Sequence, residues 1–252
     1  VGSNIANIGL LLAVTSLAWP LTVHQTIIRR EIPMMVLASG VALALGLDQW
    51  LGGGGDHFFH RSDGIVLLLL FGVFLYYTIT DALRQRQQDR FLRDASATAL
   101  PPVTAGYGKS AGIILASLLI LMAGGELTVH GATGLAQSLG ISNVVISLTL
   151  VAVGTSLPEL FTSLIAARKG QTDMAIGNIV GSNIYNLLFI WGLTATLAPA
   201  AVPAGGAFDL AAMTLFAAGL LPLAYRQRLV SRLDGGMLLA AYIVYVAMLA
   251  FR

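Results

Sequence analysis

The chain has 252 residues, of which 56% are hydrophobic and 10% are charged, and its mean hydropathy is +0.81. A soluble domain carries about 25% charged residues, so this chain has too few polar groups to cover a surface that faces water. The absence of cysteine excludes disulfides and thiolate metal sites. The composition predicts an all-α membrane protein, because a spanning helix satisfies its own backbone hydrogen bonds and lipid solvates its apolar side chains.

Eight apolar stretches have the composition of transmembrane helices. In chain order they are Ile5–Pro20, Ile32–Leu51, Gly64–Thr80, Lys109–Ser138, Ser142–Ala167, Asp173–Pro199, Leu210–Tyr225 and Gly235–Phe251. A spanning helix needs about 17–25 residues, so the third, seventh and eighth stretches are at the short end of this range. The fourth stretch is long, and we expect it to tilt or to extend past the bilayer.

Basic residues gather in alternate loops. The loops after the first, third, fifth and seventh stretches hold Arg29, Arg30, Arg84, Arg86, Arg90, Arg93, Lys109, Arg168, Lys169, Arg226, Arg228 and Arg232. The opposite side holds only Arg61 and Arg252. Because positive residues favour the cytoplasmic side, the loop 83–108 is predicted to be cytoplasmic and the C-terminus to lie outside. This topology accounts for the net charge of +2, so membrane lipid and not nucleic acid is the expected surrounding.

A short motif occurs twice. The sequence GSNIAN occupies residues 2–7 in the first stretch, and GSNIYN occupies residues 181–186 in the sixth, an offset of 179. A weaker pair, Asp63-Gly64 and Asp234-Gly235, starts the third and eighth stretches. The related stretches are five apart in order, so the copies cross the membrane in opposite directions. This pattern is typical of an inverted-topology repeat in a secondary transporter.

The repeat divides the chain into three parts. Residues 109–252 form a complete unit of five helices, residues 1–82 match only the last three helices of such a unit, and residues 83–108 form a cytoplasmic linker. The counterparts of the fourth and fifth stretches are missing from the first part. We therefore expect this sequence to be N-terminally truncated and to belong to a ten-helix fold of two inverted five-helix repeats.

Two acidic residues, Glu126 and Glu159, fall well inside apolar stretches. An ionised acid at a helix centre costs roughly 2.5–3.5 kcal/mol on insertion scales, so it is kept mainly where it faces a partner or a watery cavity. Glu126 lies near His130 at helical spacing, and an interfacial or cavity-lining role is the favoured interpretation. The histidines of residues 56–60 (DHFFH) are interpreted as part of a solvated loop, because two histidines three apart are weak evidence for a metal site.

Glu159 ends the segment AVGTSLPE, which is rich in oxygen donors. Pro158 has no N–H, so the carbonyl of Gly154 loses its helical partner and the helix kinks. Thr155 and Ser156 precede Glu159 by four and three residues and share its face of the helix. Hydroxyl, carbonyl and carboxylate oxygens are hard ligands that suit sodium and calcium. A simple proline kink, with the hydroxyls bonded to their own helix, is the alternative interpretation.

A second polar strip lies in the sixth stretch. Asn178, Ser182 and Asn186 are spaced by four and share one helix face. This strip predicts either an ion site or a helix-packing interface held by polar side chains. The copy of the strip at Ser3 and Asn7 favours a central site that both halves share.

Several of these motifs carry a family resemblance. The segments GIS (140–142), SLTLVA (147–152), GTSLPEL (154–160) and GNIVGSN (177–183) resemble the second alpha-repeat of the calcium/cation antiporter superfamily, especially its prokaryotic sodium/calcium exchangers. Residues 1–20 resemble the tail of the first alpha-repeat. The resemblance implies ten helices in two inverted halves, with ions bound midway across a prokaryotic inner membrane, which is the plasma membrane. It also implies transport of Na⁺ and Ca²⁺ without a cofactor and without enzymatic activity.

The resemblance further assigns eight residues as metal ligands. Glu159 is the implied calcium ligand of the second repeat. The implied contributors to the sodium sites and the shared cavity are Thr155, Ser156, Ala152 (through its carbonyl), Ser182, Asn186, Ser3 and Asn7. Some relatives carry Asp at the position of Asn186. The glutamate of the first repeat, the implied partner of Glu159, is not in this sequence.

The sequence thus predicts a secondary active antiporter that exchanges Ca²⁺ for Na⁺ by alternating access at a mid-membrane oxygen site. A Ca²⁺/H⁺ antiporter, in which Glu159 takes a proton instead of sodium, is the first alternative. A passive cation channel is the second. An intramembrane hydrolase is disfavoured, because no histidine lies at an evident partner position for Ser156.

Overall fold

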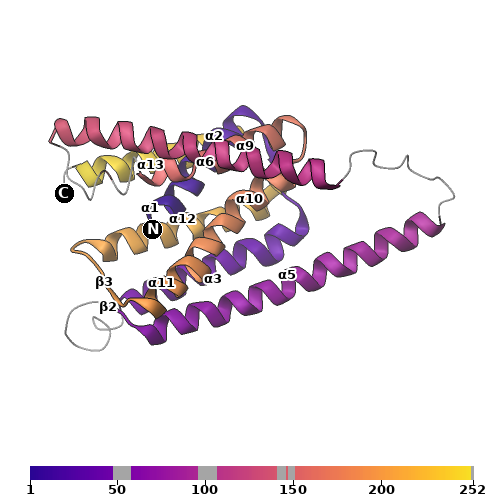
Figure 1. Cartoon of the computed structure of the whole chain (residues 1–252), viewed down its shortest axis with the longest axis horizontal. Coiled ribbons are helices and arrows are strands. Elements are labelled where there is room, and N and C mark those ends of the chain that lie inside the picture. Colours follow the sequence, from indigo (N-terminus) through magenta and orange to yellow (C-terminus); the bar gives the residue numbers. More distant parts are fainter. Residues whose placement is uncertain (48–57, 96–106, 141–145, 147–150, 251–252) are drawn as a thin grey trace.

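The structure, a computed structural model, describes residues 1–47, 58–95, 107–140, 146 and 151–250. These residues are helical almost throughout, as the all-α prediction requires (Figure 1). The α-helices are α1 (Gly2–Ala6), α2 (Ala13–Ala18), α3 (Ile32–Gly46), α5 (Arg61–Ala95), α6 (Tyr107–Ser138), α8 (Ala152–Thr155), α9 (Leu157–Arg168), α10 (Thr172–Ile184), α11 (Gly192–Leu197), α12 (Gly206–Gln227) and α13 (Arg232–Ala250). The π-helical turns are η1 (Asn7–Leu12), η2 (Ile27–Glu31) and η4 (Tyr185–Trp191). The short strands are β1 (Leu21–Thr22), β2 (Phe58–Phe59), β3 (Ala200–Ala201) and β4 (Leu229–Val230).

Five helical segments of the described chain are long and apolar enough to cross a membrane. They are Arg61–Arg84, Gly108–Ser138, Thr172–Leu197, Gly206–Arg226 and Arg232–Leu249, and they correspond to the third, fourth, sixth, seventh and eighth predicted stretches. The first stretch forms the shorter apolar helix Gly2–Ala18. The described part of the second forms α3, with η2 just before it, and the described part of the fifth forms α8 and α9. The count of eight spans stays a prediction.

The long helices present apolar side chains outward. Leu69 in α5, Ile120 in α6 and Leu215 in α12 keep 67%, 72% and 72% of their surface exposed. In water, exposed apolar surface costs about 25 cal/mol per Å². Lipid removes this cost, so the outward faces fit a protein that is embedded in a bilayer.

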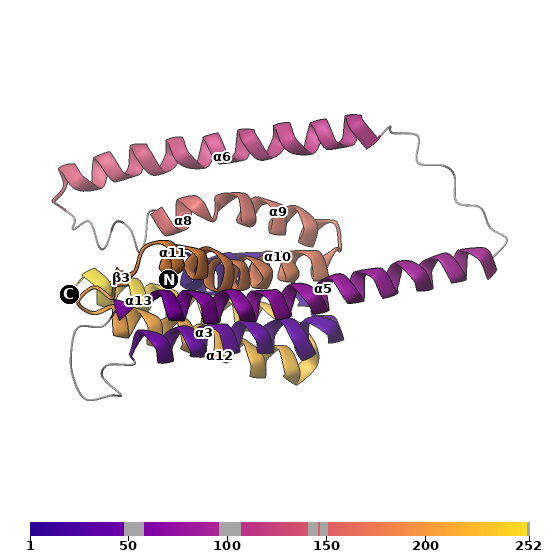
Figure 2. The same ribbon diagram turned by 60° about the horizontal axis from the view of Figure 1, so that its bottom comes forward.

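The helices form layers. In Figure 2, α6 lies outermost, α8 and α9 lie beneath it, α10 and α11 come next, and α3, α5 and α12 form the opposite side. Contacts between α6 and both α8 and α9, between α9 and α10, and between α3 and α12 agree with this order. The middle of the stack holds the buried core, in which Ile5, Ile8, Ile176 and Ile179 are almost fully enclosed.

The C-terminal boundary of the third stretch differs from the structure. The third stretch was expected to end at Thr80, but α5 continues to Ala95, into the predicted linker 83–108 (Figure 1). The residues beyond Thr80 are mainly Arg, Gln, Leu, Asp and Ala, with no Gly or Pro. Most of these residues favour helix, so the helix runs on where the apolar side chains end.

The sequence repeats make equivalent contacts. Gly64 packs against α11, where a Cβ atom at Gly64 would lie 2.6 Å from the carbonyl oxygen of Gly192. Gly235 packs against α2, where a Cβ atom would lie 2.8 Å from the carbonyl oxygen of Ala13. Ala13 and Gly192 differ by the same 179 residues as the two motif copies. Only glycine permits this approach of two helix backbones at both places.

The residues before these glycines repeat a cap. Asp63 accepts a hydrogen bond from the backbone N–H of His60 at 2.7 Å, and Asp234 accepts one from the N–H of Ser231 at 2.8 Å. Both carboxylates lie at the N-terminus of their helix, where a negative charge is stabilising.

The short strands form two antiparallel pairs, β1 with β4 and β2 with β3. Each pair joins one strand from residues 1–82 to one from residues 109–252.

Candidate functional site

The helix that carries Glu159 is broken just before it. α8 ends at Thr155, Ser156 adopts φ −96° and ψ 3°, and α9 begins at Leu157. Pro158 stands in the first turn of α9, where an N–H has no helical partner to lose. The helix thus breaks where the sequence predicts a kink, and Glu159 lies in the first turn of the new helix.

The oxygen donors around the break do not all face the same way. The carbonyl oxygen of Gly154 faces α6, where a Cβ atom at Gly125 would lie 3.1 Å from it. The hydroxyl of Thr155 donates to the carbonyls of Val151 (3.0 Å) and Ala152 (3.1 Å) in its own helix. This is the local bonding of the alternative interpretation. It uses the hydroxyl proton and leaves lone pairs on the oxygen that can still accept or coordinate.

Glu159 borders a cavity of about 420 Å³. Its Oε2 atom is buried and has no hydrogen-bond partner among the described residues. A buried carboxylate oxygen without a partner is costly unless a cation or a proton compensates it. The cavity is also lined by Gly177, Asn178, Gly181, Ser182, Tyr185, Asn186 and Ile190.

Asn178 holds the two walls of this cavity together. Its Nδ2 atom lies 3.2 Å from the carbonyl oxygen of Glu159, 2.9 Å from Oγ1 of Thr162 and 3.1 Å from Oγ of Ser163. Ser163 in turn donates to the carbonyl of Ala175 at 3.2 Å. These bonds fix α9 on α10 beside Glu159. Sequence reasoning missed Ser163, although its position four residues after Glu159 on the same helix face was the available signal.

The first motif copy meets the second beside the cavity. The Nδ2 atom of Asn186 donates to Oδ1 of Asn4 at 3.2 Å and lies 3.4 Å from Oγ of Ser3. The Nδ2 atom of Asn7 donates to Oδ1 of Asn183 at 2.9 Å. Sequence reasoning missed Asn4 and Asn183 as site residues. Both hold the third position of the repeated motif, and that shared position was the available signal.

The eight predicted ligands therefore fall into three groups. Glu159, Ser182 and Asn186 line one cavity. Ser3 and Asn7 approach the asparagines of η4 and α10, respectively, from the other half of the chain. Ala152, Thr155 and Ser156 lie at the break between α8 and α9, and α8 contacts α1. No cluster of three or more His, Asp or Glu side chains occurs within the described ranges.

Other candidate residues lie elsewhere. Glu126 and His130 are exposed on α6, apart from the Glu159 cavity. Of the predicted solvated loop, residues 56–57 lie outside the described residues, and His60 is exposed.

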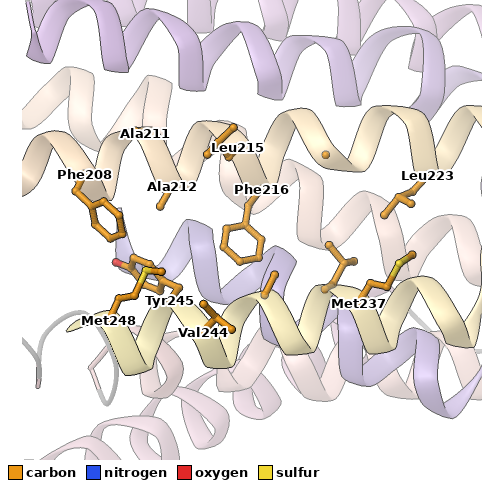
Figure 3. A pocket seen from close by; sticks show the side chains of 13 residues that line it. Phe208, Ala211, Ala212, Leu215, Phe216, Leu223, Met237, Val244, Tyr245 and Met248 are labelled. Atoms are coloured by element: carbon orange, nitrogen blue, oxygen red, sulfur yellow. The ribbon is translucent and has the colours of Figure 1, made fainter. Parts of the chain in front are cut away.

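An apolar cavity of about 600 Å³ lies between α12 and α13 (Figure 3). Phe208, Phe216, Met237 and Met248 are among its lining side chains. The hydroxyl of Tyr245, which also lines it, donates to a buried carboxylate in α12. Its lining side chains are mostly apolar, whereas a sodium or calcium ion needs several oxygen ligands.

Two further cavities lie next to the Glu159 cavity, toward the basic loops. A cavity of about 500 Å³ shares Gly177 and Asn178 with the Glu159 cavity and extends to Glu31. Another, of about 490 Å³, also contains Gly177 and Glu31 and reaches Asp81. Shared lining residues therefore link the three cavities in a series that runs from Glu159 to Arg30.

An ion pair lies at the outer end of this series. Arg30 of η2 pairs with Asp81 of α5, and its guanidinium lies 3.6 Å from the carboxylate of Glu31. One cation thus stands next to two acids, which leaves net negative charge among these three side chains.

Comparison with known proteins identifies the family. The family described as "Sodium/calcium exchanger protein" matches residues 1–80 and 109–251. The inner membrane protein YrbG of Escherichia coli (strain K12) is 35% identical over 261 residues, which cover 99% of this chain and 75% of that protein. The sodium/calcium exchanger MaX1 of Methanosarcina acetivorans is 28% identical over 225 residues, covering 80% of this chain and 64% of that protein.

A solved structure agrees with these matches. The sodium-calcium exchanger NCX_Mj, soaked with zero Na⁺ and Ca²⁺, is similar with a TM-score of 0.73 and 31% sequence identity, covering 98% of this chain and 73% of that chain. The unmatched residues 81–108 contain the predicted linker. The matched parts contain both copies of the motif and the whole Glu159 cavity. The helices, the motif pair and these similarities show that the chain is a membrane protein that belongs to the sodium/calcium exchanger family.

Proposed function

We propose that the protein is a secondary active antiporter that exchanges Ca²⁺ for Na⁺ at the Glu159 cavity. The observation that carries this proposal is the buried Oε2 atom of Glu159, which has no partner and borders a cavity with Ser182 and Asn186. Hard oxygen ligands and a negative charge are what both cations require. A cation at this place compensates the buried carboxylate.

The remaining ligands are proposed from the neighbouring elements. Thr155, Ser156 and the carbonyl of Ala152 supply oxygens for sodium from the break between α8 and α9. Ser3 and Asn7 supply oxygens from α1 and η1. The support is proximity, since α8 contacts α1 and hydrogen bonds link Asn7 and Ser3 to the asparagines of α10 and η4.

The site lies between two inverted repeats in this proposal. Repeated contacts support it: the glycine contacts at Gly64 and Gly235, and the caps at Asp63 and Asp234. The complete fold then has ten helices, with residues 1–82 in the first repeat and 109–252 in the second. The linker 83–108 is cytoplasmic.

Transport follows from electrostatics. Sodium and calcium compete for the same oxygens, and the loaded protein switches between openings on the two sides. An uncompensated carboxylate at mid-membrane is costly, so the empty cavity resists the switch. This resistance couples the two ion flows, because each crossing requires a bound cation.

The cavities that lead past Gly177 to Glu31 are proposed as the access route from the basic, cytoplasmic side. Their shared lining residues support a continuous route. The negative charge at Glu31 and Asp81 raises the local concentration of cations at its outer end.

Calcium uptake into membrane vesicles, with and without an imposed sodium gradient, tests the function. We expect uptake that requires an outward sodium gradient and that ceases when choline replaces sodium. Uptake driven by a proton gradient in the absence of sodium would replace the proposal with Ca²⁺/H⁺ exchange, in which Glu159 carries the proton. Uptake that depends on no counter-ion gradient would indicate a passive channel instead.

A further inference from the structure

The third residues of the two motif copies bond to each other reciprocally. The Nδ2 atom of Asn4 donates to the backbone carbonyl of Asn183 at 3.1 Å, and the Nδ2 atom of Asn183 donates to the backbone carbonyl of Asn4 at 3.2 Å. Their exposed fractions are only 2% and 1%. The two asparagines therefore join α1 to α10 by a pair of equivalent buried hydrogen bonds.

These bonds determine the orientation of both amides. A backbone carbonyl only accepts hydrogen bonds, so the NH₂ group of each asparagine must face the opposite backbone. The Oδ1 atom then points the other way. Asparagine amides can otherwise turn by 180° with little change in shape. Asn4 and Asn183 have no such freedom while the reciprocal pair is intact.

The fixed orientation passes to the next two asparagines. Oδ1 of Asn183 accepts from the NH₂ group of Asn7 at 2.9 Å, and Oδ1 of Asn4 accepts from the NH₂ group of Asn186 at 3.2 Å. Asn7 and Asn186 must therefore direct their own Oδ1 atoms away from the pair. Oδ1 of Asn7 is buried without a partner, and Asn186 lines the cavity beside Glu159.

Orientation decides whether these amides attract or repel a cation. The carbonyl end of an amide is a cation ligand, whereas the NH₂ end carries partial positive charge. We propose that Asn4 and Asn183 are positioning residues: their reciprocal bonds hold the amides of Asn186 and Asn7 with oxygen, not NH₂, toward the transported cation. This inference rests on the proposed function of the Glu159 cavity.

The test uses a variant of Asn186 for which the orientation of the side chain cannot matter. A carboxylate has two equivalent oxygens, so in an Asn186→Asp background an oxygen faces the cavity however the side chain is turned. Asn4→Leu removes the acceptor that orients Asn186. We expect Asn4→Leu to raise the Kd for calcium about ten- to a hundredfold, as for other residues that orient metal ligands. In the Asn186→Asp background we expect Asn4→Leu to change the Kd less than twofold.

The Kd is measured by calorimetric titration of purified full-length protein with calcium chloride, after size-exclusion chromatography has shown that each variant is folded. Thr15→Val is the control, because Thr15 is fully buried and its hydroxyl bonds only to the Leu11 carbonyl of its own helix at 2.7 Å. We expect it to leave the Kd unchanged. Asn4→Ser, which is too short to make either bond, replaces Asn4→Leu if that variant does not fold.

The outcomes separate the inference from the function on which it rests. If the unaltered protein binds no calcium, the proposed function fails and this inference fails with it. If the unaltered protein binds calcium and the Asn4 variant has the same Kd, only the positioning role is overturned. An equal loss of affinity in the Asn186 and Asn186→Asp backgrounds would also overturn it, because the loss would then not depend on amide orientation.

Discussion

The residues of the proposed cation site are of two kinds: those that carry a charge and those that orient neutral oxygens. Glu159 is the charged residue of its cavity, and its unpaired Oε2 atom is buried. Asn178 bonds to the carbonyl of Glu159 and so orients the first turn of α9. In the proposed site, a network of amides and hydroxyls thus holds the charge of Glu159 in place.

Removal of this charge provides the first prediction. Glu159→Gln keeps the shape of the side chain but removes the negative charge that a divalent cation needs. We expect sodium-driven calcium uptake to fall to background while the protein stays folded, because the buried carboxylate costs free energy and contributes little to packing. Glu126→Gln, at an exposed position on α6, is the matched control and should keep wild-type uptake. Wild-type uptake by Glu159→Gln would contradict the site assignment.

Charge also leads to a prediction about potassium. In the proposed ten-helix fold, the cavity holds Glu159 and a counterpart from the first repeat, which together carry a charge near −2. One calcium ion balances this charge, and the neutral amides of Asn186 and Asn7 add no further charge that could hold a monovalent cation. We expect sodium-driven calcium uptake to persist when choline replaces potassium. Loss of uptake that potassium restores would refute the charge argument.

Glu31 tests the access route. It lines both outer cavities, next to Arg30. Glu31→Gln removes one negative charge from this route, so we expect the apparent KM for calcium to rise about threefold at low salt on the cytoplasmic side, through weaker electrostatic attraction. The same variant should show an unchanged KM when calcium is offered from the other side. Inside-out and right-side-out vesicles separate the two cases, and an equal effect from both sides would argue against the route.

At the scale of helices, close packing depends on single glycines. A Cβ atom at Gly235 would lie 2.8 Å from the carbonyl oxygen of Ala13 and 3.2 Å from the backbone nitrogen of Leu17. Both atoms belong to helix backbone, which cannot move aside as a flexible side chain can. α13 and α2 must therefore separate to admit a methyl group.

Gly235→Ala should accordingly lower stability by about 1–3 kcal/mol, the usual cost of overpacking. Gly236→Ala is a matched control at the next position of the same helix, since a Cβ atom there meets nothing within 4 Å. There we expect unchanged or higher stability, because alanine favours helix. Thermal unfolding of the purified proteins in detergent compares the two. Equal midpoints for the two variants would show that the α2–α13 contact is not tight.

At the scale of the whole molecule, the distribution of basic residues predicts the topology. The linker 83–108 is expected to be cytoplasmic and the C-terminus to lie outside. Because the chain has no cysteine, single cysteines can be introduced without background labelling. We expect an impermeant thiol reagent to label Arg252→Cys on intact cells and to label Gln87→Cys only after the cells are opened. The reverse pattern would overturn the topology.

Local sequence signals located much of the site. The pairing of Glu159 with Pro158 indicated a break in a helix that carries a buried acid, and α8 and α9 are separated there. The spacing of Ser182 and Asn186 placed both on the face that lines the cavity. These features depend on helix period and on the missing N–H of proline, so they can be recognised from neighbouring residues alone.

Other features depend on partners that are distant in the chain. The Gly154 carbonyl faces α6, although its local environment predicted only that it would be free. A polar group without a partner in its own helix bonds to a group that the packed helices place next to it. The partner therefore depends on tertiary packing and not on the local sequence.

The sequence by itself determined a helical membrane chain, the repeated motif and the position of Glu159 beside a proline, because composition, helix period and backbone chemistry are local properties. Only the tertiary structure decided that Asn4 bonds to Asn183 across 179 residues and that Asn186 bonds to Asn4. A repeated motif indicates related halves, but it does not say which of its polar residues face each other. That choice is made by the crossing of α1 and α10, where buried amides must find partners because no water reaches them.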